Sequence, residues 1–129
     1  MPIKHTVLVA DDEQAIVRLT QMSLERNGYA VISAATGREA VERAREARPD
    51  IVLMDVMMPE MDGFEALRQL KADPVTASIP VVMMSAQSQD AAIIHGMEAG
   101  AIHYLPKPVK PAELLQVLRE TLGGAEEPA

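Results

Sequence analysis

Cysteine and tryptophan are absent from the 129 residues, and aromatic residues make up only 2% of the chain. Without cysteine there are no disulfide bonds and no thiolate chemistry. A core with so few aromatic rings has to be built from Val, Ile, Leu, Met and Ala. No apolar run approaches the roughly 20 residues of a membrane-spanning helix, and residues 1–5 lack the apolar stretch of a signal peptide. We therefore expect a cytoplasmic chain that does not contact membranes.

Positive charge is also scarce, since 12 Lys and Arg residues stand against 19 Asp and Glu residues, for a net charge of −7. This balance disfavours direct binding to nucleic acid, which needs a basic surface. A hydrophobic content of 48% argues against a disordered chain, and the length suits one domain. We expect that domain to span residues 1–122, followed by a flexible acidic tail over residues 123–129.

Apolar runs and amphipathic segments alternate five times along the chain. The runs that predict strands are residues 6–10, 29–34, 51–55, 79–85 and 102–106. The segments that predict helices run from after residue 12 to about 27, from residue 36 to about 48, from residue 64 to about 72, from about residue 90 to about 99, and from Pro111 to about 122. Thr36 and Glu39 form a capping-box pattern. This alternation predicts a parallel sheet with helices on both faces.

Chemically useful side chains follow four of the expected strands where each strand ends, namely Asp11 and Asp12, Asp55, Ser85 and Lys107. The carboxyl ends of parallel strands meet at one edge of a sheet, where ligands bind. Clustered carboxylates repel each other unless a cation is present, and Mg²⁺ prefers oxygen ligands. Asp55 is then placed to act as a nucleophile toward a phosphoryl group, with Ser85 and Lys107 binding its oxygens.

Each of these residues also has a structural explanation when it is taken alone. Asp11 and Asp12 suit the first turn of a helix, and Asp55 suits a turn. Ser85 is a strand-end hydroxyl, Lys107 a solvated charge, and Tyr104 an ordinary core residue. The functional interpretation therefore depends on all of them meeting at the same edge of the sheet.

Five sequence motifs, taken together, resemble the receiver domain of CheY-like response regulators. They are Val9-Ala10-Asp11-Asp12-Glu13, Leu53-Met54-Asp55 with Met58-Pro59-Glu60-Met61-Asp62-Gly63, Met84-Ser85-Ala86, Gly100-Ala101, and Tyr104-Leu105-Pro106-Lys107-Pro108. The resemblance covers about residues 5–122. It implies a flavodoxin-like (βα)5 three-layer sandwich, with a five-stranded parallel sheet in the order 2-1-3-4-5.

The resemblance also implies a function and a site. A sensor histidine kinase or phosphotransfer protein would transfer a phosphoryl group from phosphohistidine to Asp55 in a Mg²⁺-dependent two-component phosphorelay, with Mn²⁺ as a possible substitute. The chain would catalyse only its own phosphorylation and dephosphorylation, and would not be an enzyme otherwise. Asp12, Asp55 and the Met57 carbonyl would bind the metal directly, and Asp11 through water. Ser85 and Lys107 would bind the phosphoryl group, and Tyr104 would switch the surface formed by the fourth helix, fifth strand and last helix. The Lys107–Pro108 peptide bond is expected to be cis.

The chain departs from the family pattern in two places. Ile102-His103 occupies a position where relatives often have an acidic pair, so we expect a monomer or a weak phosphorylation-dependent dimer. Met57 and Gln87 stand where side chains tune dephosphorylation. Because a Met side chain cannot orient an attacking water, we expect the phosphoryl group to last for minutes or longer.

Two other function classes remain open from the sequence. A phosphate-handling enzyme, such as an aspartyl-phosphate hydrolase, would need a further acid–base group and a substrate-binding insertion, and neither is evident. A degenerate receiver that serves only as a binding module would lack a site residue, and none is missing. The downstream target or effector domain is not specified by the sequence.

Overall fold

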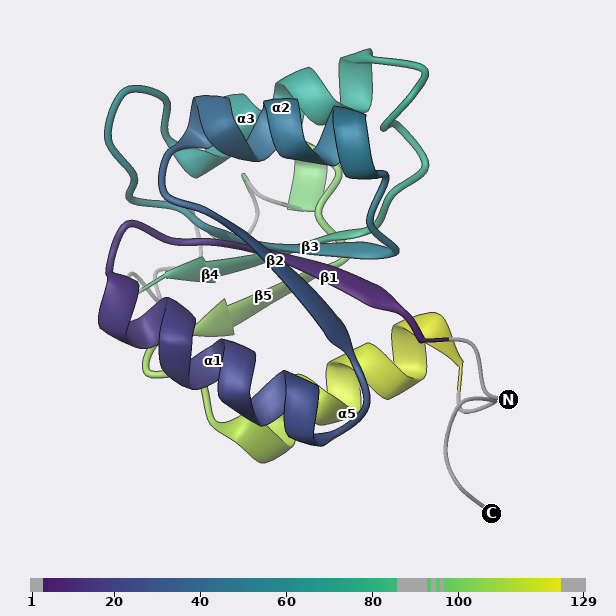
Figure 1. The fold of residues 1–129 in the computed structure, drawn as a ribbon. Coiled ribbons are helices and arrows are strands. Elements are labelled where there is room, and N and C mark those ends of the chain that lie inside the picture. Colours follow the sequence, from purple (N-terminus) through teal and green to yellow (C-terminus); the bar gives the residue numbers. More distant parts are fainter. Residues whose placement is uncertain (1–3, 86–92, 94, 96, 124–129) are drawn as a thin grey trace.

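The computed structural model describes residues 4–85, 93, 95 and 97–123. Five parallel strands form one sheet in the order β2-β1-β3-β4-β5, as the sequence led us to expect (Figure 1). The strands are β1 (Thr6–Ala10), β2 (Ala30–Ala34), β3 (Ile51–Asp55), β4 (Val81–Ser85) and β5 (His103–Pro106). The flavodoxin-like fold class is therefore confirmed.

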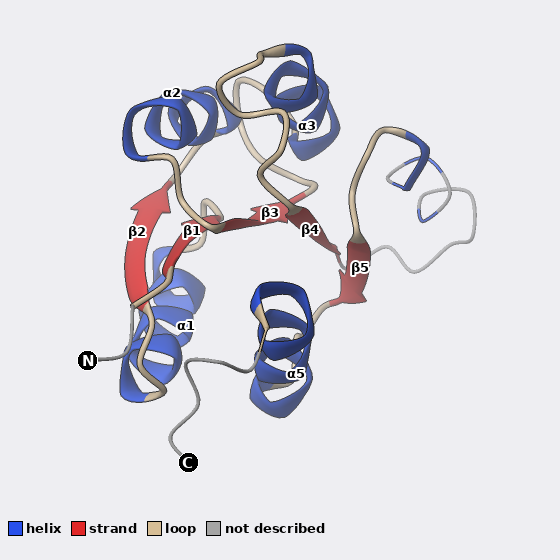
Figure 2. Ribbon diagram, turned by 90° about the vertical axis from the view of Figure 1, so that its right-hand side faces the viewer, coloured by secondary structure: helices blue, strands red, loops and turns tan. Residues whose placement is uncertain are grey.

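Helices cover both faces of the sheet, with α1 and α5 on one face and α2 and α3 on the other (Figure 2). Their bounds are α1 (Gln14–Arg26), α2 (Gly37–Ala47), α3 (Gly63–Ala72) and α5 (Pro111–Leu122). Of the helix expected over residues 90–99, residues 93, 95, 97 and 98 are helical, and the remainder of its first part lies outside the described residues. Within the described ranges, no helix has the length and apolarity needed to cross a membrane.

The central strand β3 is buried along its whole length and contributes side chains to both halves of the core. Ile51 and Leu53 pack into the apolar cluster that contains Leu24 and Leu118, on the α1 and α5 side. Val52 and Met54 pack into the other cluster, on the α2 and α3 side. This alternation is the period-two geometry of a strand, and it explains why four apolar residues in succession precede Asp55.

The first turns of α2 and α3 are fixed by side-chain caps. Thr36 Oγ1 accepts a hydrogen bond from the backbone N–H of Glu39 at 3.0 Å, and Asp62 Oδ1 accepts one from that of Glu65 at 2.9 Å. The Glu39 carboxylate reaches back to the N–H of Ala35 at 2.6 Å, one residue before the cap. The predicted capping box is thus present, with its returning bond displaced by one residue.

Candidate functional site

The register of the sheet brings the two buried aspartates to the same level. Ala10 of β1 pairs with Met54 of β3, so the next residues, Asp11 and Asp55, leave adjacent strands side by side. Each of these aspartates stands two residues after a side chain that packs on the α1 and α5 side of the sheet. Because side chains two residues apart in a strand point to the same face, both aspartates lie on that side. Lys107 stands in the same relation to Leu105. Alternation and register therefore direct all three charged groups into one place.

Three carboxylates form the acidic part of this site. Asp11, Asp12 and Asp55 each offer one oxygen, and these oxygens lie within 4.8 Å of one another. Asp11 and Asp55 are only 1% and 4% exposed, whereas Asp12 is exposed. Adjacent and opposite ligands of an octahedral Mg²⁺ are about 3 and 4.2 Å apart, given its 2.0–2.1 Å bonds. The three oxygens fit such an ion after a small closure, or with one of them binding through water.

Lys107 enters the acidic cluster from the end of β5. Its Nζ donates hydrogen bonds to Asp11 Oδ2 at 2.7 Å and to Asp55 Oδ2 at 3.1 Å. The side chain is 14% exposed, so water screens these ion pairs less than it would at the surface. One ammonium group therefore lies between the two buried carboxylates, 96 and 52 positions away in the sequence.

Negative charge exceeds positive charge in the site. Burial raises the pKa of the Asp55 carboxyl, the charge of Asp11 raises it further, and the hydrogen bond from Lys107 only partly offsets both. Burial opposes the charged form of Lys107, but its hydrogen bonds to Asp11 and Asp55, together with the negative charges of both carboxylates, outweigh that effect and raise its pKa. Three carboxylates face one ammonium, so a bound cation would relieve the remaining repulsion.

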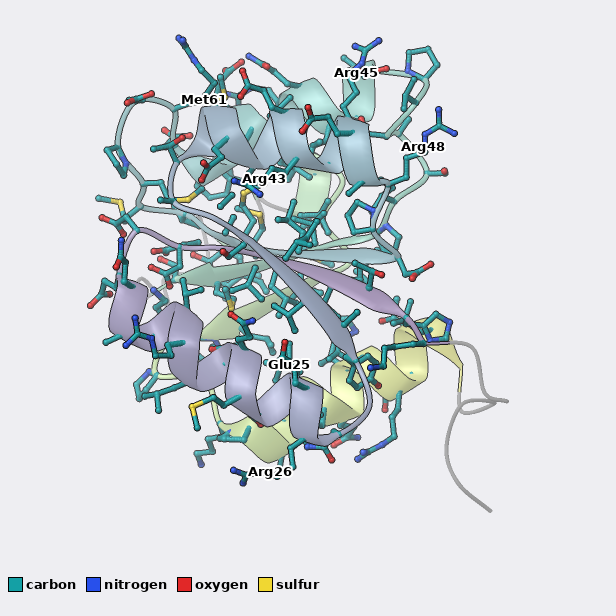
Figure 3. The ribbon with its side chains drawn as sticks, in the orientation of Figure 1. Glu25, Arg26, Arg43, Arg45, Arg48 and Met61 are labelled. Atoms are coloured by element: carbon teal, nitrogen blue, oxygen red, sulfur yellow. The ribbon has the colours of Figure 1, made fainter. Side chains whose placement is uncertain are left out.

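The loop between β3 and α3 is closely packed beneath Asp55. The backbone N–H of Met57 donates to Asp55 Oδ1 at 3.3 Å, and that of Gly63 donates to the Val56 carbonyl at 2.8 Å. A Cβ on Gly63 would overlap the Asp55 carbonyl oxygen and lie 2.9 Å from Val56 Cα. On the other side of the loop, a Cβ on Gly37 would overlap the carbonyl oxygen of Met61, which is labelled in Figure 3. Both close approaches need glycine.

We expect Gly63→Ala to disturb the site as well as the fold. The new methyl group meets backbone atoms that cannot rotate away, so the loop must shift, at a cost of about 2 kcal/mol in the free energy of unfolding. Mg²⁺ affinity should fall in the same variant, as measured by titration against melting temperature.

Gly28→Ala is the matched control for this substitution. Gly28 has a φ of 93°, but no atom lies within 4 Å of the place that its new methyl group would take, so the cost is about 1 kcal/mol of backbone strain. Its Mg²⁺ affinity should equal that of the wild type. If Gly63→Ala loses stability but binds Mg²⁺ normally, the loop does not position the site.

Ser85 and Tyr104 lie on the neighbouring strands. Ser85 ends β4, is fully buried, and accepts a hydrogen bond at its carbonyl from the Lys107 backbone N–H at 2.8 Å. Tyr104 pairs with Met83 across β4 and β5, and its half-buried side chain packs against the α2 and α3 side of the core. The Lys107–Pro108 bond is cis, as the resemblance implied. The chain segment that carries Lys107 is therefore tied to the end of β4.

The structure brings together Asp11, Asp12, Asp55 and Lys107, and it places Ser85 at the adjacent strand end. Met57 follows Asp55 with its side chain 61% exposed, and Gln87 lies outside the described residues. The sequence interpretation missed Glu13, whose Oε1 lies 3.8 Å from Lys107 Nζ. Its signals in the sequence were its place as the third acid in succession and its position in the motif Val9-Ala10-Asp11-Asp12-Glu13.

Comparison with known proteins agrees with this geometry. The sequence matches the family described as response regulator receiver domain over residues 7–119. It is 41% identical over 108 residues to the alkaline phosphatase synthesis transcriptional regulatory protein PhoP of Bacillus subtilis, covering 84% of this chain and 44% of PhoP. It is 40% identical over 119 residues to protein PilH of Pseudomonas aeruginosa, covering 92% of this chain and 98% of PilH.

A solved structure shows the same fold. A chain from the CheX–CheY–BeF₃–Mg²⁺ complex of Borrelia burgdorferi aligns with a TM-score of 0.87 at 28% identity, covering 93% of this chain and 90% of that one. The present chain thus spans nearly all of PilH and less than half of PhoP. With the family match extending over residues 7–119 and acidic residues gathered at the sheet edge, this chain belongs to the response regulator receiver domains.

Proposed function

We propose that Asp55 is the phosphoacceptor and that it receives its phosphoryl group from a phosphohistidine on a sensor histidine kinase or phosphotransfer protein. Receiver domains act in two-component systems, where phosphorylation at an aspartate is the general mechanism. One observation supports Asp55 above all others: its carboxylate ends a buried strand, pairs with Lys107 at 3.1 Å, and lies beside two further carboxylates. Such an arrangement positions a nucleophile and the charges around it before the donor arrives.

In the proposed step, an Asp55 Oδ atom bonds to phosphorus while the P–N bond to the donor histidine breaks. Lys107 Nζ exchanges its contact with Asp55 for one with a phosphoryl oxygen, and the Ser85 hydroxyl donates to another. When bound, Mg²⁺ supplies positive charge for the phosphoryl oxygens, and Mn²⁺ has the ligand preferences to substitute. Asp12, Asp55 and the Met57 carbonyl would hold the metal directly, and Asp11 through water.

The output we propose is a change at the surface formed by β5, α5 and the helical residues before β5. Movement of Ser85 toward the phosphoryl group would make room for Tyr104, as in a two-state switch. Met97 and Ile102 at this surface are 44% and 36% exposed, and such apolar side chains suit a protein target. A net charge of −7 argues against direct DNA binding by this chain, and we propose a monomer or a weak phosphorylation-dependent dimer.

We further propose that the chain works in the cytoplasm, with residues 1–122 as the receiver unit; of the tail predicted over residues 123–129, all but Gly123 lies outside the described residues. The chain would act as a signalling protein, with catalysis limited to the gain and loss of its own phosphoryl group. The β3–α3 loop suits the proposed role of Asp55 as acceptor. The positive φ of Glu60 (71°) and the close glycine contacts of this loop hold Asp55 in one geometry.

Reaction with a small phosphoryl donor tests the proposal. With phosphoramidate and Mg²⁺, the intact mass should rise by one phosphoryl group, and Asp55→Asn should stay unmodified. After donor removal the modification should decay over minutes or longer, because the apolar Met57 side chain cannot orient water. Met57→Asn should shorten the lifetime severalfold. Absence of any modification in the wild type would overturn the proposed function, and loss within seconds would refute the role given to Met57.

A further inference from the structure

Glu13 occupies the N-cap position of α1 without acting as a cap. Its side chain makes no hydrogen bond to the first turn of the helix, although Ser, Thr, Asp and Asn are the residues that normally serve there. The backbone N–H of Glu13 instead donates a hydrogen bond to Asp11 Oδ1 at 2.9 Å. The Glu13 carboxylate is therefore not needed to begin the helix.

That carboxylate lies on the solvent-exposed side of Lys107. It is 62% exposed, and its Oε1 is 3.8 Å from Lys107 Nζ, behind the closer contacts of Lys107 with Asp11 and Asp55. Asp12, also exposed, lies nearby in the acidic cluster. Because Glu13 Oε1 is 3.8 Å from Lys107 Nζ, an anion in contact with Lys107 lies close to Glu13. Its negative charge opposes that approach in proportion to the charge of the incoming group.

We propose that Glu13 selects among phosphoryl donors by their charge. Glu13 slows phosphorylation by donors of high negative charge, such as acetyl phosphate. It slows phosphorylation less for donors of lower negative charge, such as phosphoramidate, whose phosphorus is bonded to a protonated nitrogen. The effect favours transfer from a nitrogen-linked phosphoryl group over adventitious transfer from small acyl phosphates. The inference rests on the proposed role of Asp55 as the acceptor.

The two donors differ in charge while the acceptor chemistry stays the same. In both cases a bond forms between an Asp55 Oδ and phosphorus. With acetyl phosphate the bond from phosphorus to the acetyl oxygen breaks and acetate leaves. With phosphoramidate the P–N bond breaks and ammonia leaves, its nitrogen being protonated beforehand. The ratio of the two rates therefore reports the surroundings of the acceptor.

Glu13→Gln tests the proposal in the full chain. Phosphorylation rates are measured by intact mass at donor concentrations below saturation, with excess Mg²⁺ and at several salt concentrations. At low salt, the acetyl phosphate rate should rise about threefold or more, because an opposing charge has been removed. The phosphoramidate rate should rise less. The rate ratios of the variant and the wild type should converge near 1 M salt, where the screening length is about 3 Å.

Two further variants separate charge from structure. Glu25→Gln makes the same change near the C-terminal end of α1 (Figure 3). The Glu25 carboxylate accepts a hydrogen bond from Gln21 Nε2 at 3.1 Å and is not part of the acidic cluster, so the rate ratio of this variant should match the wild type. Glu13→Asp keeps the charge and should stay close to the wild-type ratio.

An unchanged ratio in Glu13→Gln, or an equal change in both rates, would overturn the inference while leaving Asp55 as the acceptor. A wild-type chain that accepts phosphoryl from neither donor would refute the proposed function, and the inference with it.

Discussion

Replacing Asp55 with Asn is expected to raise the melting temperature of the metal-free protein, by roughly 5 °C. Asp55 is 4% exposed and its carboxylate faces Asp11, and both burial and that charge raise its pKa. In its ionised form it therefore opposes folding. Asn removes the charge and keeps an oxygen that can accept from Lys107, so the existing hydrogen bond at 3.1 Å has a replacement.

The gain in stability should depend on pH in a defined direction. The pKa of Asp55 is raised above its reference value of 3.8, so the folded state binds the proton more tightly than the unfolded state does. Protonation stabilises the wild type, and this stabilisation is lost as pH rises through the folded-state pKa. The advantage of Asp55→Asn should thus be full above the folded-state pKa of Asp55 and disappear as pH falls below 3.8.

Thermal melts with and without Mg²⁺ check this expectation. Mg²⁺ should raise the melting temperature of the wild type by mass action and that of Asp55→Asn less, because the variant has lost one carboxylate ligand. Glu42→Gln, an exposed substitution on α2, should change neither value. An Asp55→Asn protein that melts at or below the wild-type temperature at neutral pH would show that Lys107 already neutralises the cluster.

The sequence predicted the sheet and the site edge because both follow from short patterns. Ile51–Met54 is apolar at every position, which requires burial on both faces, and alternation with helices then makes the strands parallel. The positions of Asp11, Asp55 and Lys107 at strand ends follow from that topology. Their contacts depend on register, which emerges only when Ala10 pairs with Met54. The 3.8 Å approach of Glu13 to Lys107 required that same three-dimensional information.

Boundary errors in the predicted strands have local causes. The run beginning at Ile79 predicted a strand two residues longer than observed. Pro80 has no N–H to give to a neighbouring strand, and the Ile79 N–H bonds to the Thr76 carbonyl in a turn. Similarly, the N–H of Tyr29 bonds to the Leu24 carbonyl at the end of α1, so β2 begins one residue later. Apolarity alone does not distinguish a buried turn residue from a strand residue.

Lys107→Met is expected to have the opposite effect on stability and also to slow phosphorylation. Without its ammonium group, Asp11 and Asp55 remain buried with no counter-charge, and the free energy of unfolding should fall by about 2 kcal/mol. Loss of a group that stabilises the transferring phosphoryl oxygens should slow phosphorylation about 100-fold. Lys110→Met, on an exposed side chain three residues later that makes no cap bond to α5, should change neither quantity.

The pH dependence and a double variant separate this charge effect from simple loss of packing. The pKa of Lys107 is raised above its reference value of 10.5, so its stabilisation is present below that pH and is lost as pH rises through the folded-state value. The stability gap between wild type and Lys107→Met should therefore be constant from neutral pH to about 10 and close above 10.5. Adding Asp55→Asn to Lys107→Met should recover part of the lost stability, because the two groups are in contact. A double variant no more stable than Lys107→Met would mean that packing, rather than the paired charge, accounts for the loss.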